Sequence, residues 1–206
     1  MSVQLAGALR RPAIGIAVAI AVAPLAAGCG GGSSEGGGGT PASNLAAGLQ
    51  AEHAGNQTVA RELFEKVLAA DPSNVYAHFD LGVIEQQANN TQAALADYGA
   101  ALTANPNFVP ALYNEATIYS SSDPSLAITV YQKVRRLQPS ASDAALNLGL
   151  LEAQAGQLKA AARDLTDAVR LDPSLAGRIP KSVSAQAKID PSKIAAANPS
   201  PTASPS

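Results

Sequence analysis

Apolar residues recur at helical spacing along the middle of the chain, in stripes that come in pairs. One pair runs through Leu81 and Ile84 and then through Ala94 and Tyr98, and residues three or four positions apart lie on one face of a helix. Polar turn signals separate the two stripes of each pair. These signals are Gly55-Asn56, Asn89-Asn90, Ser122-Asp123-Pro124 and Gly156. The pattern therefore predicts a row of helical hairpins.

The hairpins repeat with a nearly constant period. The prolines that end the units are spaced by 34, 33 and 34 residues, and a bulky residue about eight positions before each proline keeps the same spacing. Small residues in both helices share this register and let the helices of a unit approach closely. The residues predicted to pack the repeats are Gly48, Ala60, Phe64, Gly82, Ala94, Tyr98, Ala127, Tyr131, Gly149 and Ala161. Such a hairpin buries its apolar face by stacking on its neighbours.

The repeated unit resembles the tetratricopeptide repeat, a helix–turn–helix motif of about 34 residues. The Leu-Gly pair of that family appears as Leu81-Gly82 and Leu148-Gly149, and its alanine-to-aromatic step appears as Ala94 and Tyr98. The resemblance implies an all-α fold, an α-solenoid of about four units in a right-handed superhelix. The predicted units are residues 41–74, 75–108, 109–141 and 142–175.

Residues 1–28 have the pattern of an export signal. Arg10 and Arg11 precede an apolar run over residues 12–27, which is shorter than the roughly 20 residues that span a bilayer. The run ends in Leu25-Ala26-Ala27-Gly28-Cys29 and resembles the lipobox of bacterial lipoproteins. That resemblance implies cleavage before Cys29 and lipidation of its thiol. A plain signal peptide with an accidental cysteine, a weak membrane helix and a twin-arginine export signal are the alternatives.

The segments on either side of the repeats differ from them in composition. Residues 29–40 combine the predicted lipidated cysteine with a glycine-rich tether. Residues 176–189 are predicted to include a short capping helix, with Ile179 and Val183 covering the last unit. Residues 190–206 are rich in proline and serine and are predicted to be disordered.

The family resemblance also implies a concave surface lined by the first helix of each unit, and this surface is the candidate binding site. Its predicted residues are Leu45, Leu49, Tyr76, Phe79, Asp80, Val83, Tyr113, Asn114, Thr117, Leu146 and Asn147. The aromatic side chains would supply buried area in a complex, and the two asparagines would pair with a peptide backbone through donor and acceptor groups. Alternatively, the aromatic rings pack between helices and the asparagines are simply solvated.

Composition and charge exclude several classes of protein. Of the 206 residues, 47% are hydrophobic but only 4% are aromatic, so alanine-rich helices are favoured over a β-sheet core. One cysteine and two histidines exclude a disulfide framework and an ordinary Cys/His zinc site. The net charge of −2 excludes a strongly basic nucleic-acid-binding protein. No cofactor motif is present, and no nucleophile has a base beside it, so an enzyme is not expected.

These observations lead to one hypothesis and one alternative. Residues 41–175 hold eight basic and fourteen acidic residues, a net charge of −6, which favours an apolar or basic partner segment. The leading hypothesis is an adaptor or assembly factor that binds a protein or peptide while anchored by lipid to the extracytoplasmic face of a bacterial membrane. The alternative is a structural protein whose main partner is another copy of itself.

Overall fold

The computed structural model describes residues 39–198, and this part of the chain contains helices and no strand. The helices are α1 (Pro41–His53), α2 (Gln57–Ala70), α3 (Val75–Gln87), α4 (Thr91–Ala104), α5 (Val109–Ser122), α6 (Pro124–Leu137), α7 (Ser142–Gln154), α8 (Leu158–Leu171), the 3₁₀ helix η1 (Pro173–Arg178), α9 (Lys181–Ala187) and α10 (Pro191–Ala197). The predicted signal peptide, Cys29, most of the tether and residues 199–206 lie outside the described residues.

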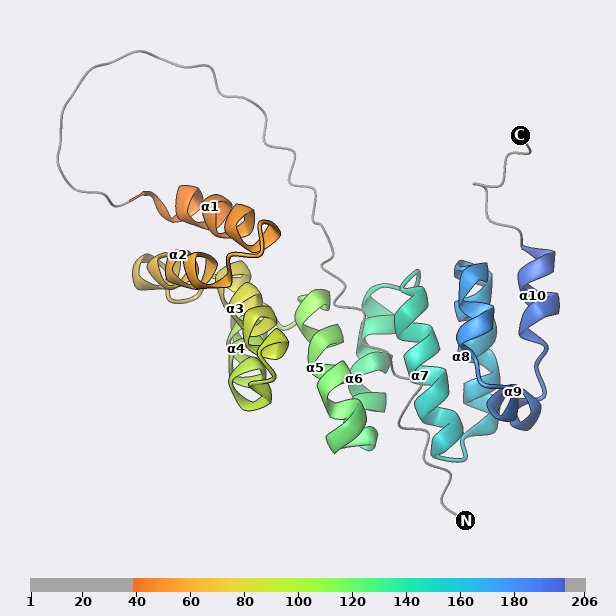
Figure 1. The fold of residues 1–206 in the computed structure, drawn as a ribbon. Coiled ribbons are helices and arrows are strands. Elements are labelled where there is room, and N and C mark those ends of the chain that lie inside the picture. Colours follow the sequence, from red (N-terminus) through yellow and green to blue (C-terminus); the bar gives the residue numbers. More distant parts are fainter. Residues whose placement is uncertain (1–38, 199–206) are drawn as a thin grey trace, which may run out of the picture.

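The first eight helices form four hairpins stacked in sequence order. Each odd-numbered helix packs mainly on the helix that follows it, and each even-numbered helix packs on the next hairpin. Figure 1 shows these pairs following one another from α1–α2 to α7–α8. The predicted all-α solenoid is therefore confirmed. We call the pairs α1–α2, α3–α4, α5–α6 and α7–α8 units one to four.

The bends between the two helices of a unit are set by residues that tolerate an unusual backbone conformation or cap a helix. The backbone is left-handed at Gly55, Asn89 and Gly156, with φ of 75°, 62° and 76°, a conformation that glycine and asparagine tolerate best. Unit three has a different bend, in which the carboxylate of Asp123 accepts from the backbone N–H of Leu126 at 3.0 Å and caps α6.

Three glycines let the two helices of a unit touch. An added Cβ would lie 2.5 Å from the Phe64 ring at Gly48 and 2.6 Å from the Tyr98 ring at Gly82. At Gly149 it would lie 2.7 Å from the side chain of Leu165. All ten residues predicted to pack the repeats are buried. The large side chain of the second helix thus fills the space that the glycine of the first helix leaves open.

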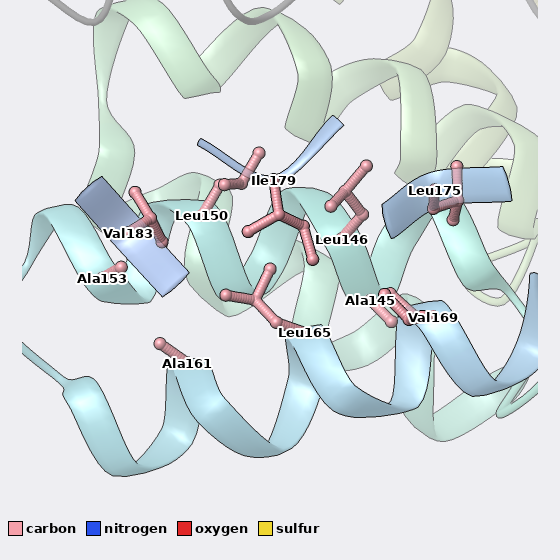
Figure 2. Close-up of a cluster of buried hydrophobic side chains, with 11 residues drawn as sticks. Ala145, Leu146, Leu150, Ala153, Ala161, Leu165, Val169, Leu175, Ile179 and Val183 are labelled. Carbon is pink, nitrogen blue, oxygen red and sulfur yellow. The ribbon is translucent and has the colours of Figure 1, made fainter. Parts of the chain in front are cut away.

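The chain after unit four covers the end of the stack. Leu175, Ile179 and Val183 are buried in one cluster with residues of α7 and α8. Figure 2 shows Ile179 and Val183 directed toward Leu146 and Leu150 of α7. We call residues 173–198 the covering segment.

The prediction that residues 190–206 are disordered is wrong for the first part of that range. Asp190 caps α10, since its carboxylate accepts from the backbone N–H of Lys193 at 3.2 Å, and Pro191 suits the first helical turn. Ile194 and Ala195 pack against the buried cluster of unit four. Because a short helix gains stability mainly from tertiary contacts, these two residues account for a helix in a segment whose composition suggests disorder.

Within residues 39–198, no helix has both the length and the apolar character that a membrane span requires.

Candidate functional site

The predicted groove residues differ widely in exposure. Tyr76 on α3 is 43% exposed. Asp80, Leu146 and Asn147 are buried. The half-buried residues are Leu45, Leu49, Phe79, Val83, Tyr113, Asn114 and Thr117. The surface available to a ligand is therefore smaller than the sequence predicted, and it lies mainly on the first three units.

The aromatic residues of unit two form a continuous row with Phe108. The ring of Phe108, at the start of α5, lies edge-on to Tyr76 and Phe79 with centroids 5.6 and 5.4 Å apart. Phe79 also lies 5.9 Å from Tyr98, centroid to centroid. Phe79 therefore follows the alternative prediction, in which the aromatic rings pack between helices and do not face a ligand. The sequence prediction missed Phe108, because the other units have no aromatic residue at that position.

The two asparagines are engaged inside the protein. Asn114 donates from Nδ2 to the hydroxyl of Tyr98 at 3.1 Å. Asn147 donates from Nδ2 to the hydroxyls of Tyr131 and Tyr113, each at 3.1 Å. Each amide therefore links its unit to the one before it. Asn147 is buried and uses its amide nitrogen in two bonds, so it does not offer a donor to a peptide backbone as predicted, whereas the half-buried Asn114 uses its nitrogen in one. Burial raises the pKa of all three tyrosines, so their hydroxyls stay neutral.

The hydroxyl of Thr117 is also used within unit three. It lies 2.9 Å from both the backbone oxygen of Tyr113 and the hydroxyl of Tyr131. Tyr113 and Tyr131 in turn contact each other edge-on, with ring centroids 5.6 Å apart. Since Asn147 of unit four bonds to the same two tyrosines, this part of the concave face is a hydrogen-bonded interface between units three and four.

Leu146 is placed in the groove by sequence reasoning, and the structure contradicts this. Its side chain is 0% exposed and belongs to a cluster with Leu175, Ile179 and Val183 of the covering segment. The repeat register has no counterpart of this segment, so the periodic pattern treats all four first helices alike. The open groove ends at unit three.

Two acids, Glu52 on α1 and Asp80 on α3, lie near enough at the other end of the groove for the charge of one to act on the other. Burial, with a smaller effect from the charge of Glu52, raises the pKa of Asp80 to about 8. Burial also raises the pKa of Glu52 on α1. Asp80 is 7% exposed and has no hydrogen bond or ion pair with any described residue.

A second hollow lies between the second helices of units three and four. It is an open pocket of about 310 Å³ lined by Gln132, Arg135, Arg136, Leu148, Arg163, Asp164 and Asp167. Most of its charges pair with one another: Arg135 Nη2 lies 2.9 Å from Asp167 Oδ2, and Arg163 Nη2 lies 2.9 Å from Asp164 Oδ2. The pocket therefore offers little uncompensated charge to a ligand.

A buried acid next to this pocket was missed by the sequence analysis. Glu152 of α7 is 0% exposed, and neither carboxylate oxygen has a hydrogen-bond partner of good geometry. Burial and, to a smaller extent, the charge of Asp164 raise the pKa of Glu152 to about 7. A comparison of equivalent positions in the repeats could have found this unpaired acid. At the equivalent position of unit two, Glu85 Oε1 lies 2.5 Å from Arg61 Nη1, whereas the counterpart of that arginine in unit three is Ile128.

We expect Glu152→Gln to stabilise the protein at pH 8 by about 2–3 kcal/mol and to change its stability little at pH 4. The pKa of this carboxyl is higher in the folded protein than in the unfolded chain. Between about pH 4.5 and about pH 7 the folded protein therefore holds a proton that the unfolded chain has already released. Stability is therefore lost as the pH rises through this window, and glutamine removes the loss. Urea denaturation at both pH values measures the effect.

Glu85→Gln is the matched control at the same position of unit two. Hydrogen bonds from Asn90 and Arg61 lower the pKa of Glu85, so its carboxylate adds stability above pH 4.5 that is lost as the pH falls. This substitution should destabilise the protein at pH 8. If both substitutions stabilise the protein at pH 8, or both destabilise it, the predicted difference between the unpaired Glu152 and the paired Glu85 is wrong.

No group of three or more His, Cys, Asp or Glu residues within the described part of the chain is placed to hold a metal ion. This leaves the concave face of units one to three as the candidate functional site.

Comparison with known proteins identifies the repeat. A family profile described as "Tetratricopeptide repeat" matches residues 45–117 and 119–176. No curated protein sequence matches the chain.

Several solved structures share the fold. MamA from Desulfovibrio magneticus RS-1 is 19% identical, with 77% of this chain and 90% of that protein aligned and a TM-score of 0.63. PilF from Pseudomonas aeruginosa is 23% identical over 77% of this chain and 76% of that protein, with a TM-score of 0.62. YrrB, described as "a TPR protein with an unusual peptide-binding site", is 20% identical over 66% of this chain and 70% of that protein, with a TM-score of 0.60.

Proposed function

Because the chain belongs to the tetratricopeptide repeat family, we propose that it is a non-catalytic scaffold that binds a protein or peptide segment on the concave face of units one to three. The observation that carries this proposal is the difference between the two ends of the groove. At unit four the covering segment buries Leu146 completely. Toward unit one, Tyr76 is 43% exposed, so a ligand can reach this part of the face, and the buried Asp80 one helical turn away has no partner among the described residues.

Charge favours a particular kind of partner segment. Residues 41–175 carry a net charge of −6, and no lysine or arginine occurs between Lys66 and Lys133. A segment that combines apolar side chains with basic ones therefore suits this face better than an acidic one. YrrB, with a similar fold, is described as having a peptide-binding site.

Self-association is the less favoured alternative. Stacking copies end on end requires bare apolar surfaces at both ends of the solenoid. At the end of unit four that surface is occupied, since Leu175, Ile179 and Val183 of the covering segment are buried on α7 and α8. A second copy would have to displace this segment.

The same proposal includes a lipid anchor in the cell envelope of a bacterium. It rests on the lipobox-like sequence that ends at Cys29, followed by a glycine-rich stretch. The first helix begins at Pro41, with Thr40 as its cap. The glycine-rich composition of residues 30–40 predicts a tether with an average span of roughly 18 Å, which would hold the groove off the membrane surface.

A photo-crosslinking residue in place of Tyr76 should capture a partner protein in bacterial membranes. The control is the same residue in place of Val59, which is 40% exposed on the second helix of unit one. We expect an adduct at position 76 and none at position 59, resolved by mass spectrometry. An adduct at position 59 alone would place the interface on the opposite face. An adduct of two identical chains would favour self-association.

Cys29→Ala should release the folded protein from membranes or leave it uncleaved. The proposed anchor is attached through this thiol, and residues 39–198 contain no helix able to span a bilayer. Fractionation at high salt followed by immunoblotting measures the effect, and wild-type protein in the same strain is the control. Processed Cys29→Ala protein that stays in the membrane fraction would contradict lipid anchoring.

A further inference from the structure

Consecutive units are joined on the concave face by a chain of polar side chains. Between units two and three, the hydroxyl of Tyr98 donates to Gln86 Oε1 at 2.7 Å. The same hydroxyl accepts from Asn114 Nδ2 at 3.1 Å. An amide of one unit, a tyrosine hydroxyl and an amide of the next unit thus form one connected network.

At the interface between units one and two, the three equivalent positions carry different residues. Counting back by one repeat, Gln86 corresponds to Glu52, Tyr98 to Phe64 and Asn114 to Asp80. Both amides are replaced by carboxyl groups, and the hydroxyl that would bridge them is missing. The first interface of the solenoid therefore has two acids where the second has a satisfied hydrogen-bond network.

The surroundings supply no cation to these acids. Asp80 is 7% exposed and unpaired among the described residues, and the charge of Glu52 acts on it as a like charge. The guanidinium of Arg61 is held by Glu85 at 2.5 Å. The neighbouring α4 adds another acid, Asp97, whose pKa is raised mainly by burial and whose Oδ1 lies 3.6 Å from Nδ1 of His78.

Other charged and titratable groups around the pair do not compensate for it. His53, on the same helix as Glu52, has a weak favourable effect on the Glu52 carboxylate, and its Nδ1 lies 2.8 Å from the backbone oxygen of Leu49. The Tyr98 hydroxyl is near enough for the charges of Asp80, Asp97 and Glu52 to raise its pKa. A buried carboxyl beside a half-buried one, without a counter-ion, is costly in its charged form, so the pair favours a proton or a cation from outside.

We propose that the Glu52–Asp80 pair receives the ammonium or guanidinium group of a lysine or arginine side chain from the partner segment. The inference rests on the proposed function, and it adds that the groove selects a segment with a basic side chain at this point. Tyr76 lies one helical turn before Asp80 on α3 and is exposed, so its ring can flank the aliphatic stem of the incoming side chain. Two carboxyls without a third ligand suit an organic cation better than a metal ion.

The test compares two peptides that differ in one charge. The probes are acetyl-Ala-Leu-Ala-Lys-Ala-Leu-Ala-amide and the same peptide with norleucine in place of lysine, titrated into the full chain and followed by NMR. We expect the lysine peptide to bind at least tenfold more tightly at pH 8. The preference should shrink as the pH falls, because the cation must displace the proton that the pair retains.

Asp80→Asn is the variant that tests the assignment. Asparagine occupies this position in units three and four, so the variant is expected to fold, which circular dichroism checks. Its preference for the lysine peptide should fall below twofold. The matched control is Glu65→Gln, which removes the same charge from an exposed position on α2 and should keep the tenfold preference. Glu52→Gln replaces Asp80→Asn if the latter does not fold.

The outcomes separate this inference from the proposed function. If both peptides bind wild type equally, or if Asp80→Asn keeps the lysine preference, the cation site is wrong while the groove stands. If neither peptide binds, the cation site is again overturned. In that case the crosslinking experiment at position 76 decides whether the scaffold function is also wrong.

Discussion

Ala94→Glu is expected to unfold the repeats, with a loss of about 4 kcal/mol or more in the free energy of unfolding. Ala94 is 0% exposed and lies in a cluster with Tyr98, Ala101 and Ala111. Close packing leaves no room for the longer side chain, and a carboxylate buried in this apolar cluster loses its hydration. Small domains are stable by only about 5–15 kcal/mol, so urea denaturation followed at 222 nm should show an early transition or none.

Ala93→Glu is the control for this prediction. The neighbouring position has the same backbone and accepts the same new charge, but its side chain is exposed. Exposed substitutions of this kind change stability by about 0.5 kcal/mol at most. If Ala94→Glu and Ala93→Glu unfold at the same urea concentration, the register of the repeats is wrong.

Ile179→Asp should detach the covering segment and destabilise unit four by about 2–4 kcal/mol. Ile179 is 6% exposed and packs in the cluster that includes Leu146 and Leu150. A carboxylate there removes apolar contacts and is unpaired. Detachment would expose the leucines of α7 and make residues 173–198 accessible to proteases. Limited trypsin digestion, with fragments identified by mass spectrometry, measures this directly.

Ser182→Asp adds the same charge to an exposed position in the covering segment. It should leave both the digestion pattern and the stability near wild type. Equal digestion of Ile179→Asp and wild-type protein would mean that the segment does not depend on this contact for its place on unit four.

The helical hairpins and their packing were predictable because the same local fit recurs along the chain. Gly82 and Tyr98 illustrate this. Opposite the Tyr98 ring there is no room for a side chain, since a Cβ added at Gly82 would lie 2.6 Å from it. A small residue opposite a bulky one recurs in every repeat, as glycine in units one, two and four and as Ala116 in unit three, and this leaves a periodic pattern that is visible without a structure.

The concave face was harder to predict because it depends on contacts that do not repeat. Leu146 occupies a groove position by register, yet the covering segment buries it completely. Asn114 and Asn147 look like free amides in the sequence. Whether they are free depends on the place of a tyrosine hydroxyl in the preceding unit, and that place is set by how one hairpin is rotated on the next.

The short helix α10 also depends on contacts that the local sequence does not reveal. Ile194 is its only large apolar residue, and the proline- and serine-rich segment that contains it predicts an unfolded chain. The contact of Ile194 with unit four supplies what the local sequence lacks. Tertiary contacts therefore override the local preference for an unfolded chain.

The covering segment also determines how long the array can be. Each hairpin presents one face to its predecessor and a complementary face to its successor, so the hairpins behave as monomers of a one-dimensional polymer that has no intrinsic length. Residues 173–198 act as the chain terminator of that polymer, because they occupy the surface on which another monomer would add. Duplication of a unit within residues 41–172 would therefore lengthen the groove and leave this terminator in place.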